Sequence, residues 1–129
     1  MPAMSAKSCK YSGVTFSGGE PLFQSNFLIE TIAQLDGLHI LLDTSGYASA
    51  EIFKRLATRV DTLYFDVKSL DPGIFRKYCS DDVEVVLRNL MQLRSLDVQV
   101  VIRVPLIPGA TDDCQNMTRI AQNIHIQWM

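Results

Sequence analysis

Apolar residues along this chain follow two spacings in turn, which predicts strands alternating with helices. Apolar runs of strand length occur at Val14–Ser17, His39–Asp43, Thr62–Asp66 and Val98–Val104. Between and after these runs, apolar residues return every three or four positions, as they do on one face of a helix. This alternation is typical of βαβ units with a parallel sheet, so we predict an α/β fold. Because His39–Asp43 and Thr62–Asp66 are continuously apolar, we interpret them as strands covered on both faces.

Five helical segments are expected, most of them preceded by a residue that caps a helix or breaks the chain. With their inward residues they are Pro21–Leu35 (Leu28, Ile32, Leu35), the segment after Ser49 (Ile52, Phe53, Leu56, Ala57), a short one after the break at Asp71-Pro72-Gly73 (Phe75, Tyr78), one capped by Asp81 or Asp82 (Val83, Val86, Leu87, Leu90) and one capped by Asp112 or Asp113 (Met117, Ile120, Ala121, Ile124).

The chain is expected to form one domain. Residues 1–11 are small and polar, and we interpret them as a loosely ordered or extended lead-in to a domain over residues 12–129. Ile124–Met129 is a candidate start of a fifth strand, which the chain ends too soon to complete. No repeat, low-complexity tract or interdomain linker interrupts the pattern.

Composition narrows the functional classes. The 129 residues are 47% hydrophobic and 20% charged, with a net charge of −2, as in an ordinary soluble domain. There is no basic cluster of the kind that binds nucleic acid. No apolar run reaches the roughly 18–20 residues that a membrane span needs, and the N-terminus lacks the apolar core of a secretory signal. We therefore predict a cytoplasmic protein without a nucleic-acid or membrane partner.

Three cysteines, Cys9, Cys79 and Cys114, are too far apart in sequence to form a CxxC-type metal clip. We interpret them as reduced, partly buried thiols. His39 and His125 are interpreted as structural, since no Ser/His/Asp arrangement accompanies them. No GxGxxG or P-loop pattern is present, so phosphate binding by those motifs is not supported.

Polar residues stand at the end of every predicted strand, where parallel α/β folds place their function. They are Gly18, Gly19 and Glu20 after the first strand, Asp43 and Thr44 after the second, Asp66, Val67 and Lys68 after the third, and Arg103 in the fourth. Adjacent glycines let backbone approach a ligand closely. Two carboxylates at neighbouring strand ends favour a cation or a polar ligand between them, because an unpaired buried carboxylate is costly.

Each of these residues also has a structural alternative. Glu20 could stabilise a helix N-terminus, and the two aspartates could bond to nearby backbone amides in turns. Lys68 and Arg103 could be salt-bridge partners of the aspartates.

Four segments, GVTFSGGEPLFQ, LLDTSGY, LYFDVKSLD and VVIRVPLIPGATDD, resemble the glycyl-radical-enzyme activating enzymes of the radical S-adenosylmethionine (SAM) superfamily, of the pyruvate formate-lyase activase type. The segments occur in order at strand ends, and the resemblance runs from residue 13 to about residue 113. It implies a fragment, with four to five strands, of a partial parallel (βα)6 barrel that binds SAM across its strand ends.

The resemblance also assigns roles to residues. Gly18, Gly19 and Glu20 match the motif that holds the SAM ammonium group. Asp43, Thr44, Asp66 and the backbone at Val67 match a monovalent-cation site beside the SAM carboxylate, and Asp43 and Thr44 are also expected to contact the cofactor. Lys68 and Arg103 match basic, catalytic residues near SAM or the substrate peptide.

In the family, a [4Fe-4S] cluster reduced by a donor such as flavodoxin cleaves SAM, and the resulting radical takes a hydrogen atom from a glycine of a partner enzyme. The family's CxxxCxxC loop, which holds this cluster, does not occur in the 129 residues. We therefore expect this polypeptide to be inactive alone, as a core fragment or one piece of a split enzyme.

Two other functions stay open. One is a barrel lyase in which Lys68 forms a Schiff base. The other is a non-catalytic module that binds a partner, or a second copy of itself, through exposed sheet edges.

Overall fold

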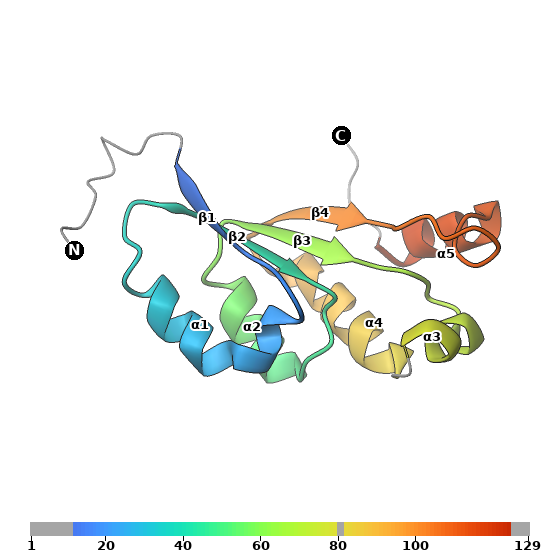
Figure 1. Ribbon diagram of the computed structural model, residues 1–129, viewed down its shortest axis with the longest axis horizontal. Helices are drawn as coiled ribbons and strands as arrows, with labels where there is room; N and C mark the ends of the chain where they lie inside the picture. The colour runs from blue at the N-terminus through green and yellow to red at the C-terminus, as the bar shows by residue number, and fades with distance from the viewer. Residues whose placement is uncertain (1–11, 80–81, 125–129) are drawn as a thin grey trace.

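The computed structural model describes residues 12–79 and 82–124, which form a four-stranded parallel sheet with helices (Figure 1). The strands are β1 (Gly13–Phe16), β2 (His39–Thr44), β3 (Thr62–Asp66) and β4 (Gln99–Arg103), and they lie side by side in chain order. Every neighbouring pair is parallel, with Val14 opposite Ile40, Leu42 opposite Leu63 and Phe65 opposite Ile102. The predicted α/β class, the parallel sheet and the four strands are confirmed.

Helices occupy the connections between successive strands, and one more helix follows β4. They are the 3-10 turn η1 (Pro21–Gln24), α1 (Ser25–Ile32), α2 (Ala50–Ala57), α3 (Pro72–Cys79), α4 (Val83–Gln92) with the 3-10 turn η2 (Leu93–Ser95), and α5 (Cys114–Ile124). The helix predicted over Pro21–Leu35 is thus divided into η1 and α1, and it ends at Ile32.

Side chains at the helix starts explain several boundaries. Ser49 accepts a hydrogen bond from the Ile52 amide, and Asp82 accepts one from the Glu84 amide. Asp113 accepts one from the Asn116 amide. These contacts confirm Ser49 as a cap and select Asp82 and Asp113 from the predicted alternatives, although Asp81 lies outside the described residues.

Pro72 and Gly73 do not break the chain before a helix, as predicted, but form its first turn. Asp71 Oδ1 accepts a hydrogen bond from the Ile74 amide and so caps α3. Proline is well tolerated at the first helical position, where its missing N–H would have no partner in the helix.

The core lies between the sheet and the helices on one side of it (Figure 1). Leu42, Leu63 and Phe65 point into it from the central strands and are fully buried, and Phe53 and Leu56 of α2 meet them. The rings of Phe53 and Phe65 pack edge to face, with centroids 5.8 Å apart. Burial of these large side chains supplies the main stabilisation of the fold.

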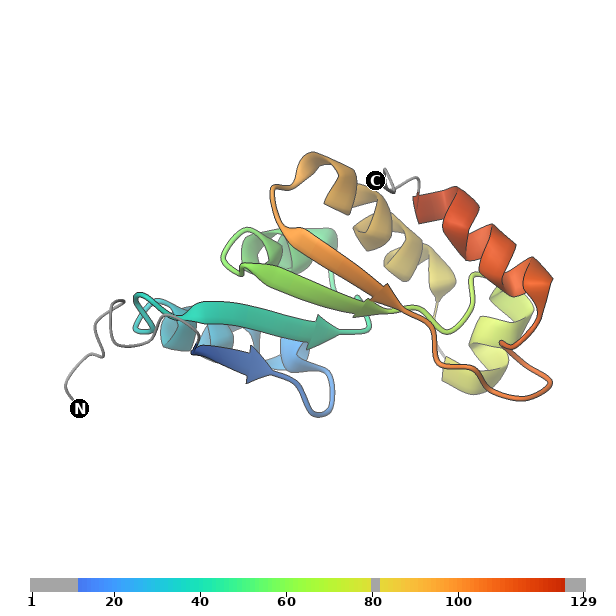
Figure 2. The ribbon, with the colours of Figure 1, turned by 90° about the horizontal axis from the view of Figure 1, so that it is seen from above.

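Within residues 12–79 and 82–124, no helix covers the other face of the sheet, as the view in Figure 2 shows. The prediction that β2 and β3 are covered on both faces is therefore wrong. Burial alternates along β2, with Ile40, Leu42 and Thr44 buried while His39 is exposed. The continuous apolar run suggested two covered faces because Leu41 contributes an apolar side chain to the open face as well.

The predicted apolar stripe of α5 is also wrong in part. Ile120 is buried, but Met117 and Ala121 are exposed, and Asn116 is buried as well among the described side chains of this helix. The side chains of Tyr78 and Ile124 lie outside the described set, as do residues 125–129 of the proposed fifth strand and residues 1–11 of the proposed lead-in.

Candidate functional site

A cleft of about 370 Å³ opens at the carboxyl edge of the sheet, and it brings together residues from the ends of three strands. It is lined by Gly19, Glu20, Asp43, Thr44, Ser45, Tyr47, Asp66, Lys68, Phe75 and Val86. Six of the residues predicted from the sequence are in this lining. Gly18, Val67 and Arg103 are adjacent in the chain or in space but do not line it.

The turn after β1 needs glycine at one of its two glycine positions. Gly18 has φ of +110°, a conformation that side chains other than glycine rarely adopt, whereas Gly19 is outside that region. A Cβ added at Gly19 would meet no atom within 4 Å. A side chain at Gly19 would therefore cause no backbone strain, but it would take up space that a ligand could use.

Glu20 joins this turn to the end of β2. Its carboxylate accepts hydrogen bonds from the Thr44 hydroxyl at 2.8 Å and from the Ser45 amide and hydroxyl at 2.8 and 2.7 Å. It also caps η1 by accepting from the Leu22 amide at 3.0 Å. The structural role considered for Glu20 is thus observed, and its negative charge is fixed at the mouth of the cleft.

Arg103 lies between the two aspartates. Its guanidinium donates to Asp66 through Nε at 2.7 Å and Nη2 at 3.0 Å, and Nη2 also donates to Asp43 at 2.7 Å. The same group lies over the Tyr64 ring, 4.9 Å from its centroid. Hydrogen bonds to Asp66 and then to Asp43 raise the pKa of Arg103 well above its usual range. The expected cation between the aspartates is thus an arginine, in agreement with the salt-bridge alternative.

Lys68 lies at the rim of the cleft with its side chain exposed. Its backbone is held from α5, because Asn116 Nδ2 donates to the Lys68 carbonyl at 3.1 Å. The preceding amide, that of Val67, donates to the Arg103 carbonyl at 2.9 Å and extends the pairing of β3 with β4. The backbone at Lys68 is therefore held by the Asn116 side chain of α5 and by the pairing of Val67 with β4.

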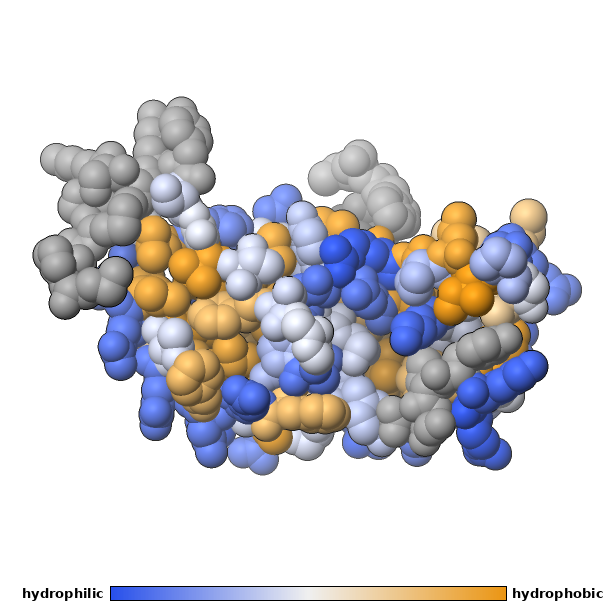
Figure 3. Space-filling model, in the orientation of Figure 1, coloured by the Kyte–Doolittle hydropathy of each residue, from blue (hydrophilic) through white to orange (hydrophobic). Residues whose placement is uncertain are grey.

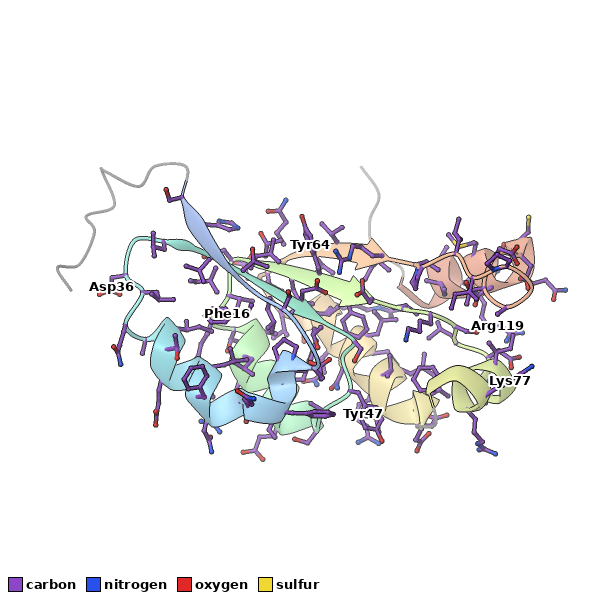
Figure 4. The ribbon with its side chains drawn as sticks, in the orientation of Figure 1. Phe16, Asp36, Tyr47, Tyr64, Lys77 and Arg119 are labelled. Atoms are coloured by element: carbon purple, nitrogen blue, oxygen red, sulfur yellow. The ribbon has the colours of Figure 1, made fainter. Side chains whose placement is uncertain are left out.

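The segment after β2 passes between β3 and α4 and forms one wall of the cleft. Gly46 has φ of +74°, and a Cβ there would lie 2.1 Å from the Phe65 ring. On the other side, the buried Asn89 donates to the carbonyls of Gly46 and Ala48 at 2.7 and 2.8 Å. Figure 4 shows Tyr47 of this segment at the lower edge of the view, below the end of β2.

Four lining residues, Ser45, Tyr47, Phe75 and Val86, were not predicted as such from the sequence, and neither was the supporting role of Asn89. Helical spacing could have indicated Asn89, because position 89 lies three residues after the inward Val86. A polar residue there needs a buried partner.

His39 does not line the cleft. It begins β2 at the opposite edge of the sheet, where its Nε2 lies 2.8 Å from Thr62 Oγ1, and Thr62 in turn donates to Gln99. A structural role is consistent with this position, while His125 lies outside the described residues.

Metal ligands are not gathered in the part of the chain that the structure describes: residues 12–79 and 82–124 contain no group of three or more His, Cys, Asp or Glu side chains able to hold an ion. Cys114 is exposed there as a free thiol, which differs from the predicted partly buried state. Cys9 and the Cys79 side chain lie outside the described set. None of the described helices is long and apolar enough to cross a bilayer.

Comparison with known proteins identifies relatives. Residues 3–120 match the radical SAM superfamily. The chain is 32% identical over 114 residues to the (2S)-3-sulfopropanediol dehydratase activating enzyme of Klebsiella oxytoca, covering 87% of this chain and 36% of that protein. It is 38% identical over 107 residues to the pyruvate formate-lyase 2-activating enzyme of Escherichia coli, covering 81% of this chain and 37% of that protein.

A solved structure of an activating-enzyme domain also resembles this chain. A domain of pyruvate-formate lyase-activating enzyme from Bacteroides vulgatus superposes with a TM-score of 0.78 and 32% identity, covering 87% of this chain and 71% of that one. The chain therefore spans a little over a third of the length of these curated relatives and most of one solved domain.

Proposed function

This chain belongs to the radical SAM superfamily, and we propose that it is the SAM-binding core of a glycyl-radical-enzyme activating enzyme of the pyruvate formate-lyase activase type. The observation that carries the proposal is the cleft at the carboxyl edge of the sheet. It brings Gly19, Glu20, Asp43, Asp66 and Lys68 within one lining, although they are spread over 50 residues of sequence.

The chemistry of the lining suits a zwitterionic ligand with an aromatic base. An ammonium group needs negative charge and backbone carbonyls, which the Gly18–Glu20 turn offers. A carboxylate needs positive charge, which Lys68 offers in the lining of the cleft. Tyr47, Phe75 and Val86 give the cleft an apolar side. A SAM molecule held there beside a [4Fe-4S] cluster supplies reductive carbon–sulfur cleavage.

The residues of this chain would bind and orient that ligand. Glu20 cannot swing freely towards it, because hydrogen bonds from Thr44, Ser45 and Leu22 fix its carboxylate. We propose that it acts through its fixed charge and by shaping the turn. Asp43 and Thr44 form the adjoining wall, and Lys68 is proposed to contact the ligand or the substrate peptide.

A monovalent cation at Asp43, Thr44, Asp66 and the Val67 backbone remains a proposal with one condition. In this structure Asp43 Oδ1 and both carboxylate oxygens of Asp66 accept hydrogen bonds from Arg103, so a cation bound by these oxygens would have to displace the guanidinium. Potassium or sodium should therefore release Arg103, and Arg103→Gln should strengthen cation binding. Equal cation affinity in the two proteins would contradict this exchange.

A glycyl-radical enzyme is the proposed protein substrate, with a flavodoxin-like electron donor. The test is to join residues 1–129 to an upstream segment that carries CxxxCxxC, reconstitute iron and sulfide, and add SAM and reductant. We expect iron–sulfur absorbance, 5′-deoxyadenosine and a glycyl radical on a suitable partner, whereas the chain alone should give none of the three. A reconstituted cluster without 5′-deoxyadenosine would contradict the proposed catalysis.

A partner-binding or split-enzyme subunit is a second candidate, supported by the sheet edges. Within the described residues β1 and β4 each pair on one side only, and unpaired strand edges favour association with another chain. Phe23 and Phe27 are also 73% and 60% exposed next to β1, and Figure 3 shows hydrophobic residues on that end of the molecule. Sedimentation of the purified chain as a concentration-independent monomer would contradict self-association.

The Schiff-base lyase alternative is less well supported. A lysine nucleophile is activated by desolvation or by a neighbouring cation, and the Lys68 side chain is exposed. Borohydride should therefore trap no carbonyl substrate on this residue.

A further inference from the structure

The cleft wall that follows β2 is fixed from behind by two amide side chains of α4. Asn89 uses both of its N–H groups on the segment, donating to the carbonyls of Gly46 and Ala48. Gln92, one turn further on, donates to the Ala50 carbonyl at 3.1 Å. The three carbonyls alternate along the chain, so residues 46–50 run along α4 with every second carbonyl turned towards it.

The two amides also hold each other. Gln92 donates to Asn89 Oδ1 at 2.9 Å, so that Asn89 has a partner for its oxygen as well as for its nitrogen. The carbonyls of the segment can only accept, which fixes the orientation of the Asn89 amide. Asn89 is fully buried. A fully satisfied buried polar group specifies one arrangement, because any other leaves its polar atoms without partners.

This arrangement meets the cleft on the opposite side of the segment. Ser45 and Tyr47 line the cleft, and so does Val86, which lies on α4 one turn before Asn89. Glu20 accepts a hydrogen bond from the Ser45 amide at the start of the segment, and Phe65 packs so close to Gly46 that a Cβ there would overlap its ring. Asn89 is the contact that ties the carbonyls of Gly46 and Ala48 to α4, whereas the Gly46 amide is held by Thr44 Oγ1 and the Ala50 carbonyl by Gln92.

We propose that Asn89, supported by Gln92, is a positioning residue that fixes the Ser45–Tyr47 wall and thereby sets the affinity of the cleft for its ligand. The effect on affinity rests on the proposed SAM-binding function, whereas the effect on the wall does not. Asn89 acts through the backbone of the segment and does not itself line the cleft.

The experiment compares Asn89→Leu, Gln92→Leu and the control Leu90→Val in the full chain. Leu90 is buried on the same helix but has no polar group to bind the segment, so its shortening lowers stability alone. Amide hydrogen exchange of residues 45–50 is measured in the free protein, under conditions where each variant is folded. Binding of S-adenosylhomocysteine is then measured by calorimetry under the same conditions.

Asn89→Leu should accelerate exchange over residues 45–50 and weaken S-adenosylhomocysteine binding by roughly 10-fold or more, since small displacements of a supporting group have effects of this size. Gln92→Leu should give a smaller change in the same direction, and it keeps the test available if Asn89→Leu does not fold. Leu90→Val should leave exchange in the segment and ligand affinity unchanged.

Equal exchange in the segment for Asn89→Leu and Leu90→Val would overturn the inference. Faster exchange with unchanged ligand affinity would also overturn it, because the wall would then not determine binding. If the unmodified chain binds no S-adenosylhomocysteine, the proposed function fails, and the exchange measurement still decides whether Asn89 fixes the wall.

Discussion

Gly46 is the position where the structure makes its sharpest stability prediction. The residue has φ of +74°, and an added Cβ would lie 2.1 Å from Phe65 Cζ, 2.6 Å from Cε2 and 3.0 Å from Cε1. The ring cannot simply turn away, because Phe65 is fully buried and packs edge to face on Phe53. Gly46→Ala therefore combines a strained backbone with an overpacked core.

The two effects can be estimated separately. Placing alanine in the left-handed region costs about 1–2 kcal/mol, and overpacking a well-filled core costs about 1–3 kcal/mol more. We therefore expect Gly46→Ala to lower the free energy of unfolding by about 2–5 kcal/mol. This is a large part of the roughly 5–15 kcal/mol that is typical of a domain.

Gly109→Ala is the matched control. Gly109 has φ of +76°, but a Cβ there would meet nothing within 4 Å. It should therefore show the backbone cost alone, about 1–2 kcal/mol. Urea denaturation followed by circular dichroism measures both variants. Equal losses of stability in the two would refute the close approach of Gly46 to Phe65.

Three further predictions concern the cleft and its surroundings. Gly19→Ala should change the free energy of unfolding by less than about 0.5 kcal/mol, because the added Cβ meets no protein atom. It should nevertheless weaken S-adenosylhomocysteine binding, because the Cβ enters the space proposed for the ligand. Unchanged binding in calorimetry would contradict this. Arg103→Met should lower the free energy of unfolding by no more than about 1 kcal/mol, since the Arg103 side chain is 42% exposed. The difference in this free energy between the variant and the unmodified chain, measured by urea denaturation, should shrink in high salt. A difference that does not depend on salt would count against the ion pairs. The Ile74 amide and then Arg119 lower the pKa of Asp71 from its ordinary value of 3.8. The stability that the Asp71 carboxylate contributes is therefore complete above pH 3.8 and is lost as the pH falls through the lowered pKa. Asp71→Asn should remove this part of the acid dependence of stability, and an unchanged acid profile in the variant would argue against the contribution of Asp71.

The main elements could be predicted because their signals are local. Thr62–Asp66 is a strand with the bounds expected from its apolar run, and Ser49 caps α2 as its side chain suggests. The carboxyl edge of a parallel sheet collects the ends of its strands whatever the details of packing. Residues as distant as Glu20 and Lys68 could therefore be placed together in advance.

What the sequence could not supply depends on long-range packing. Whether an apolar strand is covered on one face or on both depends on which helices pack against the sheet. Leu41 is only partly buried, and Tyr64 lies on the open face, where Figure 4 shows it above the sheet. Arg103 was expected near a ligand, but only the register of β4 on β3 shows that it reaches both Asp43 and Asp66. Asn89 is separated by 43 residues from the Gly46 carbonyl that it binds.

Titration of S-adenosylhomocysteine into the isotope-labelled chain, followed by amide NMR, tests the central claim most directly. We expect saturable chemical-shift changes at Gly19, Ser45, Tyr47 and Lys68, with little change at Gln99 on the opposite edge of the sheet. No saturable change at millimolar ligand, or changes that centre away from the carboxyl edge of the sheet, would contradict it.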